Sequence, residues 1–444
     1  QENMEWISAV RLFSYEPSGT EFFTSNRNSV RWSFLLTKCG GGSKRAVLKC
    51  GGDTSPSDIM VATPMVVLKM AKKTITTSTE EFILTQLKAI NPDKYNLVRW
   101  EYSFVCDGHL WQEFELLDIS LKEFLHLRGT LSLIEIRPII HQLATALEAL
   151  KNLGIVHADL KPQNIMMVDH ELQPLKVKVI DFGCSTSVHN VPEGWKPQTR
   201  WYRAPEVLLG LPCTEAIDMW SLGCIAVELF HGLELYPGDC EYDMIWSIAQ
   251  SHKQFPQHLL NAGSKTSQFF KHESDQWRVM TPEEYGVPNV KCFTILDELK
   301  KTNQESVDHL LTVDSLVYTT DLEDFVELVM EMLQLDPSKR ITPRQVLQHR
   351  FITMQSMLHF LDASSFAQSS VDAMDSCHCH LGIPNSSQVF TQQPRQPTPS
   401  DCQAFKTHDL PSGDKVSDKT FSKLNCMCNA PEQLCLCFRF DFIS

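Results

Sequence analysis

Two short polar stretches carry the strongest signal in this chain. Residues 157–164 read His-Ala-Asp-Leu-Lys-Pro-Gln-Asn, and residues 181–183 read Asp-Phe-Gly. The first stretch follows an apolar pattern with spacings of three and four residues over 134–153, which predicts an amphipathic helix. The second follows a short β-like run, 177–180. Both stretches are therefore predicted to be loops at the ends of regular elements.

The side chains of these two loops match the chemical needs of phosphoryl transfer. That reaction needs a carboxylate beside the attacking hydroxyl, a cation on the transferring phosphate and oxygen ligands for magnesium. Asp159 supplies the carboxylate and Lys161 supplies the cation. Asn164 and Asp181 carry oxygens of the kind that the hard Mg²⁺ ion prefers. We therefore predict Asp159 and Lys161 as catalytic residues, and Asn164 and Asp181 as magnesium ligands.

The composition is that of a folded, acidic protein. Of 444 residues 43 % are hydrophobic, which is enough to bury a large core and excludes disorder throughout. The 54 acidic and 40 basic side chains give a net charge of −14, which argues against a nucleic-acid-binding protein. There is no apolar run long enough for a transmembrane helix and no basic-then-apolar secretory signal at the first residues. We therefore expect an intracellular protein with no membrane partner.

The order of the patterns predicts an α+β protein with two lobes. Short apolar runs mixed with Gly, Ser and Thr indicate antiparallel strands in a strand-rich lobe over 32–116, with one helix near 78–90. Residues 117–355 are predicted to form a helical lobe that contains both loops.

The two ends of the chain lie outside these lobes. Residues 1–31 are predicted to be an N-terminal extension. Residues 356–444 are rich in Ser, Gln, Pro and Asn, so a mainly disordered tail is expected. The tail holds a cluster at 377–380 and two CxC pairs, at 426–428 and 435–437. Zinc binding and palmitoylation are open alternatives for these cysteines, but CxC is not the usual CxxC spacing, and we favour a metal-free tail.

Further motifs extend the pattern toward a known family. Ala204-Pro205-Glu206 follows the second loop, and the chain then reads Asp218-Met219-Trp220 and, later, Arg340-Ile341-Thr342. In this order, over about 32–355, the motifs resemble those of the eukaryotic protein kinases. The resemblance implies a bilobal kinase fold, an Asp218 that braces the catalytic loop and a Glu206 that pairs with Arg340.

A closer resemblance is to the homeodomain-interacting protein kinases, with the dual-specificity tyrosine-regulated kinases next. It rests on the HADLKP, VKVIDFG and EAIDMW stretches, and on residues 95–99 and 340–343. It implies a protein serine/threonine kinase that uses ATP and Mg²⁺ in the nucleus or cytoplasm. Protein substrates and transcription-regulator partners are implied too. Arg203 matches an arginine that favours proline after the phosphoacceptor, although a plain surface cation is an alternative.

The resemblance also implies the nucleotide-binding residues. Lys69 matches the lysine that holds the ATP phosphates, with Lys72 or Lys73 as alternatives. Its partner is predicted to be Glu80, or Glu81 if the register is off by one. The glycine loop is expected to contribute Gly40, Gly42 and Val47, and the hinge after the gatekeeper Phe114 to contribute Glu115 and Leu117.

Several positions depart from the family pattern. Ala158 replaces an arginine that would hold an activation-segment phosphate, and Lys196 replaces a tyrosine that the family autophosphorylates. Thr199 and Tyr202 are the remaining hydroxyl candidates in that segment. The other departures are Arg45, Val67 and Glu113. These changes support an alternative function, a catalytically weak pseudokinase that acts as a binding scaffold.

Overall fold

The computed structural model describes two lobes joined by one short connection. It covers residues 4–7, 66–71, 79–106, 109–189, 191, 195, 197–252, 254–287 and 312–377. The predicted glycine-loop residues Gly40, Gly42, Arg45 and Val47 lie outside these ranges, as do Lys72, Lys73 and Lys196.

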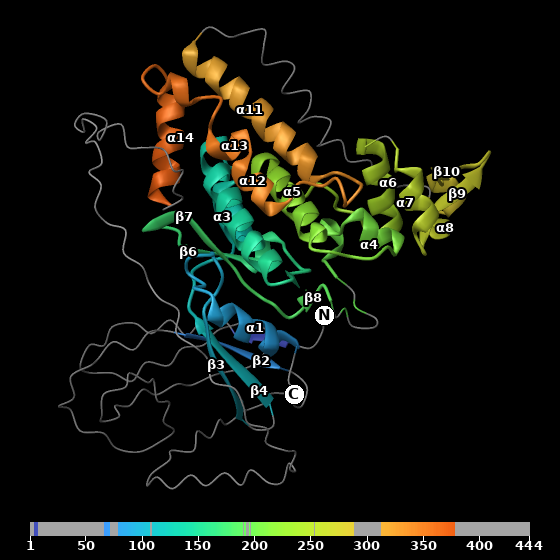
Figure 1. The fold of residues 1–444 in the computed structure, drawn as a ribbon, viewed down its shortest axis with the longest axis horizontal. Coiled ribbons are helices and arrows are strands. Elements are labelled where there is room, and N and C mark those ends of the chain that lie inside the picture. Colours follow the sequence, from blue (N-terminus) through green and yellow to red (C-terminus); the bar gives the residue numbers. More distant parts are fainter. Residues whose placement is uncertain are drawn as a thin grey trace, which may run out of the picture. The chain divides into compact units, whose positions relative to one another are not determined.

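The small lobe is an antiparallel sheet with one helix against it (Figure 1). Its strand order is β1-β2-β4-β3, and the strands are β1 (Met4–Ile7), β2 (Val66–Ala71), β4 (His109–Glu115) and β3 (Trp100–Cys106). Strand β1 belongs to the segment that the sequence assigned to an N-terminal extension. It pairs with β2 through backbone hydrogen bonds. The side-chain pattern of a sequence does not show such bonds, so this strand was not predicted. Helix α1 (Thr79–Ala89) confirms the helix predicted near 78–90.

The large lobe is mostly helical and confirms the predicted α+β class. Its helices are α2 (Leu121–Arg128), α3 (Leu133–Asn152), α4 (Pro205–Leu209), α5 (Ala216–His231), α6 (Glu241–His252), α7 (Gln257–Ala262), α8 (Thr266–Phe269), α9 (Pro282–Tyr285), α11 (Val313–Met332), α12 (Pro343–Gln348), α13 (Arg350–Thr353) and α14 (Ser365–Ser376). Its strands are β5 (Ile155–Val156), β6 (Ile165–Asp169), β7 (Gln173–Val179), β8 (Thr186–Ser187), β9 (Phe270–Glu273) and β10 (Gln276–Val279), with short 3₁₀ turns η1 (Pro162–Asn164), η2 (Arg200–Tyr202) and η4 (Leu358–Phe360).

Helix α3 forms the centre of the large-lobe core. Its apolar residues Ile136, Ile140, Leu143 and Leu147 are almost completely buried, in agreement with the predicted spacing. Helices α5 and α11 lie beside it (Figure 1). The 20-residue helix ends immediately before β5, so the rigid core fixes where the loop that follows β5 begins.

The folded part of the chain extends beyond the predicted domain end. Helix α14 lies within the segment that the sequence assigned to a disordered tail, and it packs against α3 and α11. Its buried residues Ala367, Ser370 and Met374, together with Cys377 directly after it, recur every three or four positions. The Ser364 side chain caps its first turn by accepting from the Ala367 N–H. Four small or medium side chains are a weak signal in a Ser- and Gln-rich composition, which is why composition alone pointed to disorder.

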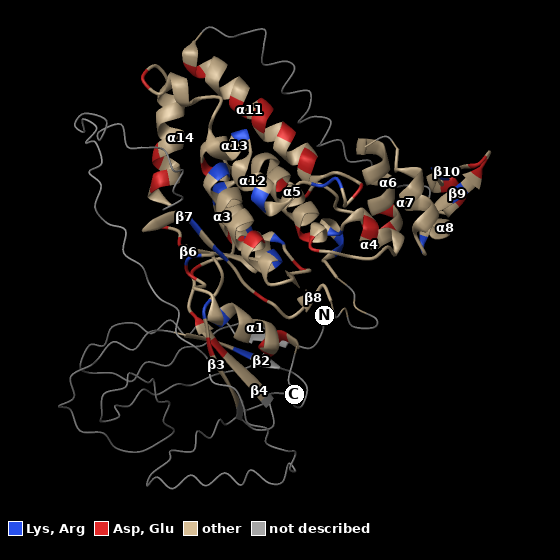
Figure 2. Cartoon of the chain, in the orientation of Figure 1, with Lys and Arg blue, Asp and Glu red and all other residues tan. Residues whose placement is uncertain are grey.

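Charge is unevenly spread over the described elements. Figure 2 shows acidic positions recurring along α11, whereas Lys and Arg are scattered over several elements. None of the described helices combines the length and apolar character that a membrane span requires.

His141 on α3 should make folding stability depend on pH. Burial, together with the nearby Lys176 cation, lowers the pKa of His141 to about 4. The unfolded chain therefore takes up this proton near pH 6.5, whereas the folded protein resists it until about pH 4, so stability is lost as the pH falls through that window. Between pH 7.5 and 5.0, His141 should account for a loss of about 1–2 kcal/mol.

Urea unfolding of the wild type and His141→Gln at both pH values tests this dependence. The wild type should lose more stability than the variant on acidification. Equal losses in the two proteins would show that His141 does not couple protonation to folding.

Candidate active site

Lys69 lies at the centre of a buried ion-pair network between the lobes. It sits on β2 opposite Gln112 of β4, and its side chain is fully buried. Its Nζ lies 2.6 Å from Glu80 Oε1 on α1 and 2.8 Å from Asp181 Oδ1. Burial lowers the pKa of Lys69, but the two carboxylates outweigh burial and raise it, so the side chain stays protonated.

The structure shows which of the two predicted glutamates pairs with Lys69. Glu80, and not its neighbour Glu81, makes the ion pair with Lys69. Burial opposes ionisation of Asp181, yet Lys69 holds the pKa of this carboxyl below its usual value. The network therefore joins β2, α1 and the Asp-Phe-Gly loop through one ammonium group. The nucleotide-binding role of Lys69 and Glu80 stays a prediction.

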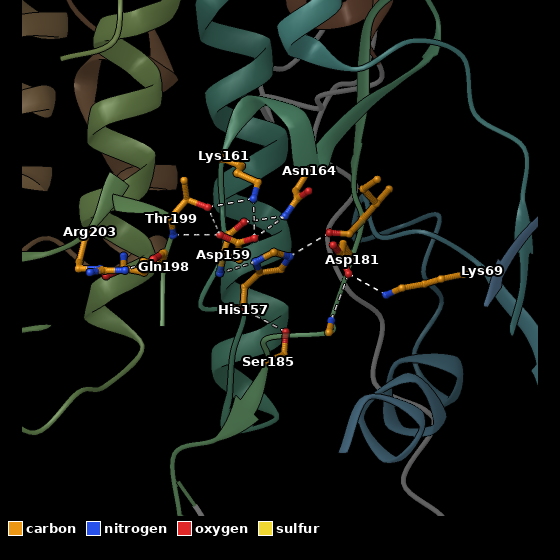
Figure 3. A network of polar contacts seen from close by, with 12 residues as sticks. Lys69, His157, Asp159, Lys161, Asn164, Asp181, Ser185, Gln198, Thr199 and Arg203 are labelled. Carbon is orange, nitrogen blue, oxygen red and sulfur yellow. Dashed lines mark hydrogen bonds and ion pairs between the residues drawn. The ribbon is translucent and has the colours of Figure 1, made fainter. Parts of the chain in front are cut away.

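The carboxylate of Asp159 is held from both sides (Figure 3). Lys161 Nζ lies 2.7 Å from Oδ2, and Asn164 Nδ2 donates to the same oxygen at 3.1 Å. On the other side, Thr199 donates to Oδ1 through both its hydroxyl, at 2.6 Å, and its backbone N–H, at 3.0 Å. These four donors fix the orientation of the carboxylate.

Asp218 of α5 holds the backbone of the loop that carries Asp159. Asp218 accepts the backbone N–H groups of His157, at 2.8 Å, and Ala158, at 2.9 Å. The His157 ring nitrogen lies 3.0 Å from the Ile180 carbonyl, which ties this loop to the one that carries Asp181. Ala158 has a φ of 64°, a left-handed conformation that costs energy in a residue other than glycine. The hydrogen bonds that Asp218 accepts from the N–H groups of Ala158 and of the preceding residue support that conformation.

Asn164 and Asp181 suit the predicted magnesium ion. Asn164 ends η1, and its carbonyl accepts from the Ile180 N–H, so the two residues lie on adjoining segments. The amide nitrogen of Asn164 donates to Asp159, which leaves its side-chain oxygen as the atom for a metal. Asp181 binds Lys69 through Oδ1, and a quarter of its side chain is exposed. An amide oxygen and an ionised carboxylate are suitable donors for Mg²⁺.

The hinge residues have different environments. Phe114 is almost fully buried and lies opposite Val67 in the sheet register. The side chain of Glu115 points into ion pairs with Lys178 and Arg99, so its predicted contact with nucleotide would be made by its backbone. Leu117 is buried, and Glu113 is half-buried within β4.

The end of the activation segment is tied down by Gln198. Gln198 has a φ of 64°, its side chain is fully buried, and its amide bonds to the Tyr202 carbonyl and the Ser221 hydroxyl. Its own carbonyl accepts from Arg203 Nη2 at 2.8 Å, and Arg203 Nη1 pairs with Glu241 at 2.7 Å. Sequence reasoning missed Gln198 and Glu241, because no spacing signal marks a left-handed residue or a partner 38 residues away.

Three further contacts involve residues at the end of the activation segment, and the family resemblance implied the first of them. Glu206 makes a two-pronged ion pair with Arg340, at 2.7 and 2.9 Å, and both side chains are almost completely buried. Tyr202 donates to Glu228 at 2.6 Å, and burial raises the pKa of its hydroxyl far above the usual range. The Thr199 hydroxyl is bound to Asp159. In this arrangement both hydroxyl candidates are engaged inside the protein.

The comparison with known protein families agrees with this geometry. A family model described as a protein kinase domain matches residues 35–352, so the chain belongs to the protein kinase family.

The similar relatives within that family are homeodomain-interacting protein kinases, as the sequence motifs predicted. Homeodomain-interacting protein kinase 1 of Mus musculus is 43 % identical over 312 residues, which cover 67 % of this chain and 26 % of that protein. Homeodomain-interacting protein kinase 4 of Homo sapiens is 35 % identical over 310 residues, 65 % of this chain and 50 % of that protein. The chain matches between about a quarter and a half of the length of these relatives.

Proposed function

We propose that this chain transfers the γ-phosphate of ATP to serine or threonine hydroxyls of proteins, with Mg²⁺ as cofactor. The observation that carries the proposal is the set of contacts around Asp159, with Lys161, Asn164 and Thr199 all within hydrogen-bond distance. A substrate hydroxyl beside Asp159 would be oriented and would give its proton to the carboxylate. Lys161 would steady the transferring phosphoryl group.

The remaining residues would position the nucleotide. Lys69, held by Glu80, offers a protonated ammonium group to the phosphates. Asn164 and Asp181 would hold magnesium, which would supply positive charge to neutralise the phosphate oxygens. Catalysis of this kind is mostly placement and charge neutralisation.

The pseudokinase scaffold is the alternative function. Val67 and Glu113 support it, because the family has smaller or apolar residues there. The Lys69–Glu80–Asp181 network speaks against it, because a scaffold has no chemical need to bury a lysine between two carboxylates. Radiolabelled transfer from Mg-ATP to a peptide library distinguishes the two. Absence of transfer from folded protein would support the scaffold.

We further propose that the enzyme prefers a proline after the phosphoacceptor. Arg203 engages the carbonyl of Gln198, so that carbonyl is turned toward the arginine and away from a bound peptide. Any other residue at that peptide position would bring an N–H group without an acceptor, whereas proline has none.

Arg203→Ala should therefore reduce the preference for Ser-Pro over Ser-Ala peptides. An unsatisfied donor costs about 1–3 kcal/mol, so the wild type should prefer Ser-Pro by about tenfold or more in kcat/KM, and the variant by less than about threefold. Arg200→Ala is the matched control, since Arg200 donates to the Asp239 carbonyl and not to Gln198. An unchanged preference in Arg203→Ala would contradict the assignment.

For partners and location we propose transcription regulators and an intracellular setting, the nucleus or cytoplasm. The support is the name of these relatives, which refers to interaction with homeodomains. Phosphorylation of a homeodomain protein by the purified chain, compared with an unrelated Ser-Pro protein, tests this proposal. Equal rates on both would remove its support.

A further inference from the structure

Four charged side chains form a closed ring beside the hinge. Lys178 Nζ lies 2.6 Å from Glu115 Oε1 and 2.5 Å from Asp93 Oδ1. Arg99 completes the ring, with Nη2 3.2 Å from Glu115 Oε2 and Nη1 3.2 Å from Asp93 Oδ2. We call Asp93, Arg99, Glu115 and Lys178 the charge ring. Each cation contacts both anions, so the charges of the four groups cancel.

The charge ring joins three parts of the kinase fold. Asp93 and Arg99 lie in the connection between α1, which carries Glu80, and β3. Glu115 ends β4 at the hinge, and Lys178 lies on β7, three residues before Asp181. Backbone hydrogen bonds connect the same three segments. The Glu115 N–H donates to the Arg99 carbonyl, and the Val98 N–H donates to the Val179 carbonyl. One cluster therefore links the helix connection, the hinge and the strand that leads to the metal ligand.

Burial shows which contact within the charge ring matters most. The side chains of Lys178 and Glu115 are 5 % and 10 % exposed, whereas Asp93 and Arg99 are about half exposed. Burial raises the pKa of Asp93, but Lys178 and Arg99 outweigh it and hold that pKa below its ordinary value. An ion pair at the surface contributes little, but a buried charge that loses its partner is costly. The Lys178–Glu115 pair is therefore the contact of the charge ring that is most costly to break.

We propose that Lys178 is a positioning residue for the nucleotide, acting through Glu115 on the hinge backbone. This inference rests on the proposed kinase function, in which the hinge at Glu115 and Leu117 receives the base of ATP. Lys178 itself touches neither the phosphates nor the peptide in this assignment. By pairing with Glu115 it holds the end of β4 in one place relative to β7 and Asp181.

Lys178→Met should raise KM for ATP by about five- to tenfold while leaving KM for the peptide within about twofold. Lys178→Arg keeps the cation, so it should restore most of the ATP affinity. Lys176→Met is the matched control, because Lys176 lies on the same strand but donates to Asn96 and not to the hinge. Circular dichroism and thermal melting establish that each variant is folded.

Direct binding of ADP, measured by calorimetry, separates this inference from the proposed function. Weaker ADP binding in Lys178→Met than in Lys176→Met would support the positioning role even if the wild type transferred no phosphate. Absence of phosphate transfer from the wild type would count against the proposed function alone. Equal ADP affinities, or a KM for ATP that is the same in Lys178→Met and Lys176→Met, would overturn the positioning role.

Discussion

Asp159→Asn should lower the rate of phosphate transfer by about 10³-fold, with the protein still folded. The amide has nearly the shape of the carboxylate, so Lys161 and Thr199 remain in place, but it cannot accept the proton of the attacking hydroxyl. Loss of this base and of its charge removes an effect of several kcal/mol in the transition state. Transfer of radiolabelled phosphate to a Ser-Pro peptide, with wild type and variant side by side, measures the change.

Asp169→Asn is the matched control for this prediction. Asp169 ends β6 in the same lobe and accepts backbone N–H groups of its own turn, away from Asp159. It should keep the transfer rate within about threefold of the wild type. A wild-type rate in Asp159→Asn would exclude Asp159 as the base, and binding of Mg-ADP by both proteins would show that the nucleotide site had survived.

Arg340→Leu should lower the free energy of unfolding by about 3–5 kcal/mol. Arg340 makes two buried hydrogen bonds to Glu206, and it also donates to the Ala216 and Gln334 carbonyls. The substitution leaves the Glu206 carboxylate buried without its counter-ion, and that unpaired charge accounts for most of the cost. Urea unfolding at pH 7.5 measures the difference.

Arg128→Leu serves as the control for that measurement. Arg128 pairs with Glu135 at 2.6 Å, a distance similar to that of the buried pair, but its side chain is about half exposed. Its loss should cost about 1 kcal/mol or less. If both substitutions cost the same, the burial of the Glu206–Arg340 pair would not be the source of its stability.

The pairing of Glu206 with Arg340 also shows how far sequence motifs reach. The two residues are 134 positions apart, and their contact was implied by the family resemblance, not by any local pattern. The helix over 134–153 could be predicted without the family resemblance, because the spacing of its apolar residues indicates which face is buried. The α+β class and the kinase motifs were predictable for the same reason, since they depend on neighbours in the chain.

Gln198 and Lys178 show what could not be predicted. Gln198 has a left-handed backbone conformation, and its carbonyl accepts a hydrogen bond from Arg203. A glutamine in the sequence indicates neither the conformation nor the contact. In the sequence, Lys178 is one charged residue in a strand of alternating pattern. In the structure it lies buried between Asp93 and Glu115, which are 85 and 63 residues away.

Local patterns in the sequence were therefore sufficient for the fold class, the long helix over 134–153 and the residue types that phosphoryl transfer requires. The three-dimensional packing was needed to show that Glu80 and not Glu81 pairs with Lys69, and that α14 packs against α3 and α11. It was also needed to show that Lys178 pairs with Glu115. The physical reason is that helix and strand patterns arise from contacts a few residues apart. Ion pairs and burial between distant segments depend instead on how the whole chain packs.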